Sequence, residues 1–489
     1  MKIVVCIIII LFVVIRKLMR MKKRKKNAVA AGPAGVPLLG NLLQFDNAKP
    51  LVYLQDLSHK YGGVAYLRHG STPILVVSSG KVAKQILKSQ DSRPPVLAQQ
   101  KLSYNGVDMA FSPYNPHWRE TRRMCTLHLF SPKQILSFRP VREAQVSRVI
   151  SKLHARLNHP ANLSDMAMSL ASNTICGVAF GKTYDDDEYE KKKLDKLVLE
   201  AQALMVSFYV SDHFKVFGFL DKLSGLSSRV ETNFQELDSF YQQLIDDHLN
   251  PIPSSSSSGD PDIIDLMLKL KGEKPDSITW DQIKALLMNL FVAGTDTVAA
   301  AIVWTMTALM LRPDIMRKTQ EHIREAVGRK DDGIMITEDE LMKLPYLKAV
   351  VMEGLRLYPP APLLYRTVEE SHLVEGLQVE VGTKFIINGW AIARDPAIWE
   401  DPEEFVPERF LNVSDSDWEF KMLPFGGGKR RCPGMNMGMM SIHLALANLL
   451  YSFDWAGPPS APPIDTDALP GLTMHKKNPL ILVPTLPLS

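Results

Sequence analysis

The stretch Pro424-Phe425-Gly426-Gly427-Gly428-Lys429-Arg430-Arg431-Cys432-Pro433-Gly434 carries the most specific information about the fold. Its three consecutive glycines allow the backbone to approach a flat ligand closely. Cys432 directly precedes an apolar segment, residues 435–451, that is predicted to be helical, so helix N–H groups and three neighbouring basic residues would lower the pKa of its thiol. A single thiolate in such a loop suits an axial iron ligand. A structural cysteine in a glycine-rich turn is the alternative interpretation.

The composition of the chain excludes several classes of protein. Of 489 residues, 46% are hydrophobic and 22% are charged, which is typical of a globular protein rather than a disordered or collagen-like one. The net charge is +4, but nine basic residues lie within residues 1–26, so the remaining chain carries −5. No basic surface for nucleic acid is therefore expected. The four cysteines are far apart and without CxxC spacing, which argues against a disulfide framework or a structural zinc site.

The N-terminus is predicted to be a membrane anchor. Residues 3–15 form an apolar run, and residues 16–26 form a basic stop-transfer segment. A helix of that length reaches only about 20 Å, so flanking residues would have to complete the span of a ~30 Å bilayer core. Because the positive charge follows the apolar run, the positive-inside rule places the rest of the chain in the cytosol. A signal peptide cleaved near Ala28-Val29-Ala30 is the alternative.

The rest of the chain is predicted to form one domain that is mainly α with a minor β portion. A Pro- and Gly-rich connector, residues 27–45, precedes a single catalytic domain, residues 46–489. Short β patterns occur at 64–67, 74–77, 384–387 and 480–483, and helical periodicity dominates residues 117–357.

The cysteine loop resembles the haem-binding loop of the cytochrome P450 family, Phe-x-x-Gly-x-Arg-x-Cys-x-Gly. The fixed positions are filled by Phe425, Gly428, Arg430, Cys432 and Gly434. The resemblance implies the cytochrome P450 fold and haem b as cofactor, with the Cys432 thiolate as the axial ligand of the haem iron. It further implies that Arg430 pairs with a haem propionate and that Phe425 shields the thiolate.

The apolar segment 280–311 is predicted to be a long helix that contains Ala293-Gly294-Thr295-Asp296-Thr297. The Thr297 hydroxyl can bond back to the carbonyl of Ala293, four residues earlier, and so loosen the helix. A packing notch of small residues is the alternative. The run resembles the Ala/Gly-Gly-x-Asp/Glu-Thr motif of the family, which implies that Thr297 and Asp296 are catalytic and assist oxygen activation and proton relay.

Glu353 and Arg356 are three residues apart on a predicted helix, where a solvated ion pair is the usual meaning. The spacing resembles the Glu-x-x-Arg motif of the family, which is completed by Arg409 in Pro407-Glu408-Arg409-Phe410. The resemblance implies a buried structural triad that supports the haem pocket, and loss of one partner would leave an uncompensated charge.

Three further residues are predicted to contact the haem carboxylates. Trp118 and Arg122 lie four residues apart and match the Trp-x-x-x-Arg of the family, so one helical face would carry an indole N–H and a guanidinium. Arg366 is the third candidate, although Tyr365 stands where the family usually has proline.

The motifs run in family order from residues 33–40 to 472–484, so the resemblance covers essentially the whole chain. The runs 345–350, 293–297 and 432–434 resemble those of the plant microsomal A-type group. The resemblance implies a haem-thiolate monooxygenase of the endoplasmic reticulum membrane that uses O2 and electrons from NADPH, delivered by NADPH–cytochrome P450 reductase to a basic surface near Lys429. No Gly-x-Gly-x-x-Gly follows a predicted strand, in agreement with an external electron donor. A same-fold haem enzyme that catalyses rearrangement or dehydration without O2, and a non-catalytic haem or membrane scaffold, are the alternatives.

The substrate is predicted to be a hydrophobic small molecule, such as a terpenoid, phenylpropanoid, alkaloid or aldoxime of plant secondary metabolism. By resemblance, its pocket is lined by mostly apolar segments, which are residues 103–111, 205–208, 290–293, 361–364 and 471–473.

Overall fold

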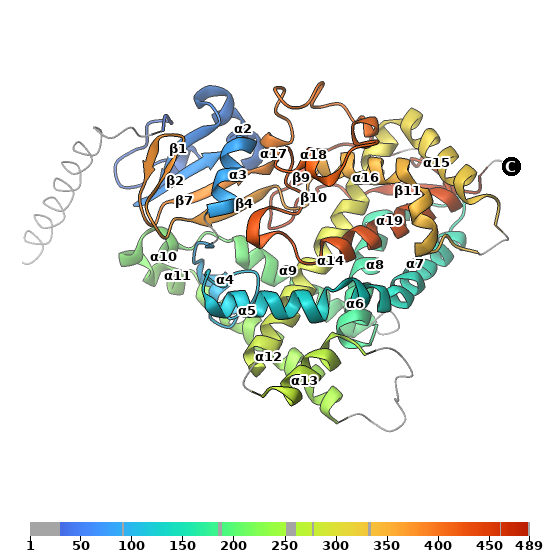
Figure 1. The fold of residues 1–489 in the computed structure, drawn as a ribbon, viewed down its shortest axis with the longest axis horizontal. Helices are drawn as coiled ribbons and strands as arrows, with labels where there is room; N and C mark the ends of the chain where they lie inside the picture. Colours follow the sequence, from blue (N-terminus) through green and yellow to red (C-terminus); the bar gives the residue numbers. More distant parts are fainter. Residues whose placement is uncertain are drawn as a thin grey trace, which may run out of the picture.

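The computed structural model describes residues 30–89, 92–183, 188–250, 261–275, 278–330, 334–459 and 461–487. The predicted membrane anchor, residues 1–26, lies outside these ranges. Helices make up most of the described chain and strands a small part of it, gathered mainly near the N-terminal region (Figure 1). The prediction of a mainly α fold with a minor β portion is confirmed.

The helices are distributed along the whole described chain. They are α2 (Pro50–Tyr61), α3 (Gly80–Ser89), α4 (Leu97–Leu102), α5 (Pro116–Met124), α6 (Pro132–Ser137), α7 (Arg139–His154), α8 (Leu163–Phe180), α9 (Glu188–Val206), α10 (Val210–His213), α11 (Phe219–Leu223), α12 (Leu226–Leu249), α13 (Ile263–Glu273), α14 (Trp280–Leu311), α15 (Pro313–Val327), α16 (Pro345–Leu357), α17 (Gly389–Ile392), α18 (Asp415–Trp418) and α19 (Met435–Ser452).

The strands are short. They are β1 (Val64–His69), β2 (Thr72–Val77), β3 (Ala161–Asn162), β4 (Leu363–Thr367), β5 (His372–Val374), β6 (Leu377–Val379), β7 (Lys384–Asn388), β8 (Asp454–Ala456), β9 (Ala468–Leu469), β10 (His475–Lys476) and β11 (Ile481–Thr485).

Helix α14 is the central helix of the domain, and it begins and ends where the sequence predicts. A capping box starts it, because the Thr279 side chain accepts from the backbone N–H of Gln282 while the Gln282 side chain accepts from that of Thr279. Most residues of α14 are buried, and the helix packs against α8, α16 and α19. Among the described residues, α14 is the one helix long and apolar enough to cross a bilayer, and its burial is that of a core helix.

The main sheet has four strands in the order β1-β2-β7-β4. Strands β1 and β2 form an antiparallel hairpin, β7 runs parallel to β2, and β4 runs antiparallel to β7. Three of the predicted β patterns lie in this sheet, and the fourth forms β11, which pairs with β3 and β8. The strands are buried in an alternating or continuous pattern, and their side chains pack against α3 in one apolar cluster and against α2 in another.

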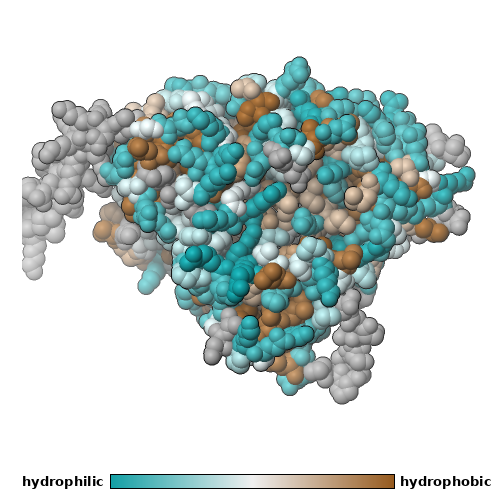
Figure 2. Space-filling model, viewed as in Figure 1, coloured by the Kyte–Doolittle hydropathy of each residue, from teal (hydrophilic) through white to brown (hydrophobic). Residues whose placement is uncertain are grey.

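The described part of the predicted connector is packed against the folded domain. The backbone N–H of Tyr66 donates to the carbonyl of Ala31 at 2.9 Å, and that of Asn41 donates to the carbonyl of Arg68 at 2.6 Å. Residues 30–45 therefore run along the edge of β1 instead of standing apart as a spacer. On the face in Figure 2, polar side chains cover most of the surface and apolar side chains occur in scattered patches.

Candidate active site

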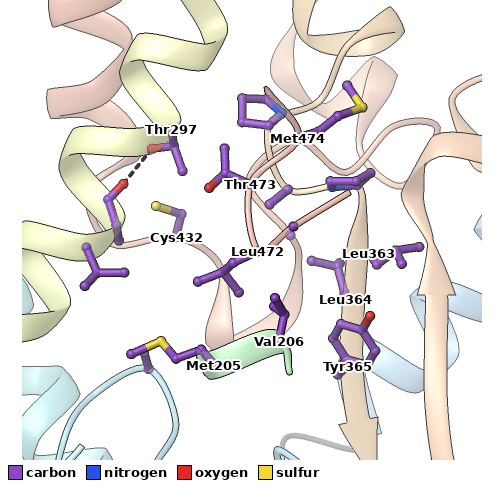
Figure 3. Close-up of a pocket in the computed structure, with 18 of the residues that line it drawn as sticks. Met205, Val206, Thr297, Leu363, Leu364, Tyr365, Cys432, Leu472, Thr473 and Met474 are labelled. Atoms are coloured by element: carbon purple, nitrogen blue, oxygen red, sulfur yellow. Dashed lines mark hydrogen bonds between the residues drawn. The ribbon is translucent and has the colours of Figure 1, made fainter. Parts of the chain in front are cut away.

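One cavity of about 1550 Å³ joins the cysteine loop, α14, α5 and the main sheet. Cys432 of the cysteine loop and Thr297 of α14 line the same side of it, and apolar side chains such as Leu472 and Leu364 lie between them and strand β4 (Figure 3). Each of the five segments predicted to form the pocket contributes to its lining, for example Phe111, Met205, Leu290, Leu364 and Leu472. A mostly apolar cavity with a few polar groups, here a thiol and a hydroxyl, is suited to binding a hydrophobic molecule.

The cysteine loop places the thiol of Cys432 at the cavity wall, directly before α19. The backbone N–H of Cys432 donates to the carbonyl of Phe425 at 2.9 Å, which closes the loop on itself. The thiol is accessible from the cavity although it lies deep in the protein. Burial raises the pKa of the thiol, and the Gly434 N–H, Arg122 and Arg431 oppose that rise.

Burial therefore outweighs the predicted lowering of this pKa by the flanking basic residues, a lowering to which Arg431 does contribute. Two of the three flanking basic side chains, those of Lys429 and Arg430, contact other groups. Lys429 Nζ lies 3.2 Å from the hydroxyl of Tyr114, and Arg430 Nη2 donates to the carbonyl of Ser112 at 2.7 Å. Sequence order could not show that their ammonium and guanidinium groups point away from the sulfur.

The three glycines of the loop have different roles. Only Gly426 lines the cavity. Gly428 has φ of +69° and packs on α3, where an added Cβ would lie 1.8 Å from the carbonyl oxygen of Leu87. At Gly428 the backbone therefore lies close to α3 and not to a ligand. Of the three glycines, only Gly426 is placed where the backbone could approach a ligand, as the sequence predicted.

We expect Gly428→Ala to destabilise the cysteine loop strongly. A left-handed backbone costs a non-glycine residue about 1–2 kcal/mol, and overpacking adds about 1–3 kcal/mol. The yield of folded protein and the denaturant midpoint should both fall. Gly457→Ala is the matched control, because its Cβ would meet open space without a positive φ. Equal midpoints for the two variants would contradict the packing role of Gly428.

The Thr297 hydroxyl donates to the carbonyl of Ala293 at 2.7 Å, as predicted (Figure 3). Thr297, Ala293 and Gly294 line the cavity. The alternative packing notch is also present, because a Cβ at Gly294 would lie 2.4 Å from Cδ1 of Ile175 in α8. Small residues therefore bring α8 close to the point where the Thr297 hydroxyl faces the cavity.

Asp296 lies on another side of α14 and is absent from the cavity wall. Its side chain is 4% exposed, and Oδ1 lies 2.9 Å from Nε2 of His475 in β10, which is 30% exposed. The buried carboxylate of Asp296, adjacent in sequence to Thr297, is thus paired with a partly exposed imidazole. Sequence analysis missed His475, since nothing in its local sequence indicates a partner 179 positions away.

The four residues predicted to hold haem carboxylates or to lie near them, Trp118, Arg122, Arg366 and Arg430, all line the cavity. All four have protein partners. The indole N–H of Trp118 donates to the carbonyl of Met109 at 2.9 Å, and Arg122 Nη2 donates to that of Arg431 at 2.6 Å. Arg366 Nη1 donates to the carbonyl of Tyr365 at 2.8 Å, and Arg430 Nη2 to that of Ser112 at 2.7 Å. The guanidinium of Arg430 stacks over the Trp118 ring at 4.4 Å from its centroid.

Arg93 is a further basic residue on this wall, and sequence analysis missed it. Its Nε is buried and has no hydrogen-bond partner among the described residues, and burial lowers the pKa of its guanidinium. A buried, incompletely paired guanidinium requires an anion nearby. A thiol on one side and a set of arginines at the rim fit a haem, which presents one iron and two carboxylates.

The predicted triad is brought together beneath the cavity. Arg356 Nε and Nη2 donate to the two carboxylate oxygens of Glu353 at 2.7 and 2.8 Å, and both side chains have no exposed surface. Arg409 Nε lies 3.4 Å from Glu353 Oε1. The solvated-pair alternative is excluded by this burial.

Comparisons with known proteins place the chain in a family. The cytochrome P450 family model matches residues 30–483. The chain is similar to 6,7,8-trihydroxycoumarin synthase of Pastinaca sativa, at 46% identity over 472 residues that cover 93% of this chain and 92% of the relative. It is also similar to 5-OH-xanthotoxin synthase of Ammi majus, at 44% identity over 473 residues with the same coverage.

A solved zebra fish cytochrome P450 with progesterone has the same fold, with a TM-score of 0.77 at 23% identity, and covers 89% of this chain and 99% of its own. The chain therefore belongs to the cytochrome P450 family, as its cysteine loop predicts. Its class is that of a haem-dependent monooxygenase.

Proposed function

We propose that the protein hydroxylates an aromatic secondary metabolite of the coumarin type, with Cys432 as the axial ligand of haem b. The observation that carries the proposal is the single cavity that joins Cys432 and Thr297 to an apolar wall. The two plant relatives are named as synthases of a trihydroxycoumarin and of 5-OH-xanthotoxin, which supports the substrate type.

The bound haem would supply oxygen activation, and the residues of the chain would bind, orient and supply protons. Cys432 would hold the iron, and Arg93, Arg366 and Arg430 would neutralise the two carboxylates. Apolar side chains such as Leu364 and Leu472 would exclude water and hold the aromatic body. The Thr297 hydroxyl would hold a proton at the cavity wall.

Asp296 is proposed to act as a positioning and relay residue rather than one that contacts the substrate. Its carboxylate does not line the cavity, but it lies one residue before Thr297 and pairs with the partly exposed His475. Protons from solvent would pass through this pair toward the Thr297 end of α14.

The activity is tested with purified holoenzyme, NADPH–cytochrome P450 reductase and a panel of coumarins. We expect an NADPH- and O2-dependent product whose mass exceeds that of the substrate by one oxygen atom. A product of unchanged mass formed without NADPH would favour the alternative rearranging enzyme. Turnover of alkaloids or terpenoids without any turnover of coumarins would contradict the substrate type.

Thr297→Ala should retain the haem spectrum, but NADPH consumption should become uncoupled from product formation. Loss of the hydroxyl removes a positioned proton donor, so we expect the product formed per NADPH to fall about tenfold, with hydrogen peroxide released instead. Thr305→Ala is the matched control, because Thr305 makes the same back-bond to Ala301 in α14 at 2.7 Å but does not line the cavity. Unchanged coupling in Thr297→Ala would refute the role of the hydroxyl.

The membrane and electron-transfer partners are also proposals. The apolar and basic segments within residues 1–26 favour a single-pass anchor in the endoplasmic reticulum membrane with a cytosolic catalytic domain. The exposed basic side chains of Lys429 and Arg119 flank the Tyr114 ring, at 4.7 and 6.0 Å from its centroid, beside the cysteine loop. This surface would attract an acidic face of NADPH–cytochrome P450 reductase.

A further inference from the structure

The part of the cavity wall formed by the main sheet and α10 carries four titratable side chains that the proposed oxidation does not use. His69 ends β1, Lys384 begins β7, and Asp212 and His213 end α10. All four line the cavity and together form the entrance cluster. The cavity opens to solvent here, because the 77% exposed Leu43 is also part of its wall.

The sheet register and α10 bring these residues together. The partner of Lys384 in β2 is Ile74, which pairs in turn with Leu67 of β1, so the end of β1 and the start of β7 lie at the same end of the sheet. Helix α10 covers that end in Figure 1. The hydroxyl of Ser71 donates to the carbonyl of His213 at 3.3 Å, which fixes the helix on the β1–β2 turn.

The polar atoms of the entrance cluster are not satisfied by one another. His69 is 9% exposed, yet its Nε2 is buried and has no hydrogen-bond partner in the described part of the chain. The same is true of Nδ1 of His213. The two rings lie 5.8 Å apart between their centroids. Lys384 is partly buried, and burial lowers the pKa of its ammonium while the nearby charge of Asp212 raises it.

The charges of the cluster determine which ligand group it suits. Burial lowers the pKa of His69 and of His213 to about 4, with Lys384 adding to the effect, so both rings are neutral at pH 7. Burial raises the pKa of Asp212 to about 6, so this carboxyl is mostly ionised there. One cation and one anion leave little net charge, and a second anion would be repelled by Asp212.

We propose that the entrance cluster binds a hydroxyl group of the substrate, which is therefore an apolar molecule with an alcohol or phenol at one end. A hydroxyl can accept from Lys384 and donate to an imidazole nitrogen or to Asp212, whereas a hydrocarbon would leave all four groups desolvated. The apolar body would then extend toward Cys432 along the wall. The inference rests on the proposed function for the identity of the ligand as substrate, but the site can be tested by binding alone.

The neighbouring rings would hold a flat molecule at this position. His213 stacks on Phe208 with centroids 4.8 Å apart and planes 4° apart, and His69 meets Phe45 edge-to-face at 5.6 Å. An aromatic body can enter against these faces while its hydroxyl reaches the polar atoms between them.

The test measures binding to the holoenzyme by equilibrium dialysis at neutral pH, without NADPH or reductase. The probes are 7-hydroxymethylcoumarin, 7-ethylcoumarin, which has a methyl group in place of the hydroxyl, and coumarin-7-carboxylate. We expect the alcohol to bind about tenfold more tightly than the ethyl compound, as for a hydrogen bond to a charged group. Lys384→Met should abolish most of this preference.

The control variant is Lys49→Met, which removes an exposed lysine that also lines the cavity. It should leave the preference intact. His213→Phe, which keeps a ring against Phe208, should reduce the preference and provides a second test if Lys384→Met folds poorly. Equal binding of the alcohol and the ethyl compound, a preference that survives both cluster variants, or tightest binding of the carboxylate would each overturn the proposal. Because no turnover is measured, failure of the coumarin oxidation would not affect the result.

Discussion

Cys432→Ala is expected to abolish the thiolate-type spectrum of the carbon monoxide complex and all oxidation of substrate. Among the described residues the cavity is lined by two cysteines, of which only Cys432, in the loop that precedes α19, offers an accessible sulfur. Cys125 is fully buried in the π-helix Cys125–Leu129, and burial raises the pKa of its thiol to about 12, so it stays neutral at pH 7. Without Cys432, the described part of the cavity wall has no thiolate left to ligate the iron.

The matched control for this prediction is Cys125→Ala. It removes a sulfur from the same cavity wall but should leave the carbon monoxide spectrum and the haem content unchanged, with a moderate loss of stability from the small cavity it creates. A thiolate-type spectrum in purified Cys432→Ala, or its loss in Cys125→Ala, would show that the iron is ligated by a residue other than Cys432.

The fold was largely predictable because its main signals are local. The apolar run of α14 and the cap formed by Thr279 and Gln282 define a helix from neighbouring residues alone. The same holds for α19, predicted at 435–451 and found at Met435–Ser452. The pairing of β2 with β7 joins residues more than 300 positions apart, and no local pattern contains that register.

Side-chain direction in the site could not be read from the sequence. Asp296 and Thr297 are adjacent, but one turn of a helix places successive side chains on different sides, and only Thr297 faces the cavity. The basic residues around Cys432 were visible in the sequence, whereas the Ser112 carbonyl and the Tyr114 hydroxyl that engage two of them come from a distant segment. Arg93, His475 and the entrance cluster were missed for the same reason.

Arg356→Lys is expected to prevent formation of stable holoenzyme. The Arg356 guanidinium makes five hydrogen bonds, two of them to Glu353 and three, at 2.7 to 2.9 Å, to the backbone carbonyls of Ala393, Pro402 and Glu404. A lysine has three N–H groups on a single nitrogen and cannot reach these divergent acceptors. Glu353 would then keep a fully buried and poorly paired charge, which costs about 3–5 kcal/mol.

That loss is a large share of the roughly 5–15 kcal/mol by which domains are stable, so soluble yield and haem content should both fall severely. Arg409→Lys is the graded control. Arg409 is 14% exposed and lies 3.4 Å from Glu353, so its replacement should cost only about 1 kcal/mol and leave haem bound. The hydrogen bonds of Arg356 connect α16 to the segment between α17 and the cysteine loop. The Arg356→Lys variant should therefore lose haem even in the fraction of protein that stays soluble. Arg356→Lys holoenzyme with normal haem content and denaturant midpoint would mean that this buried cluster does not support the pocket.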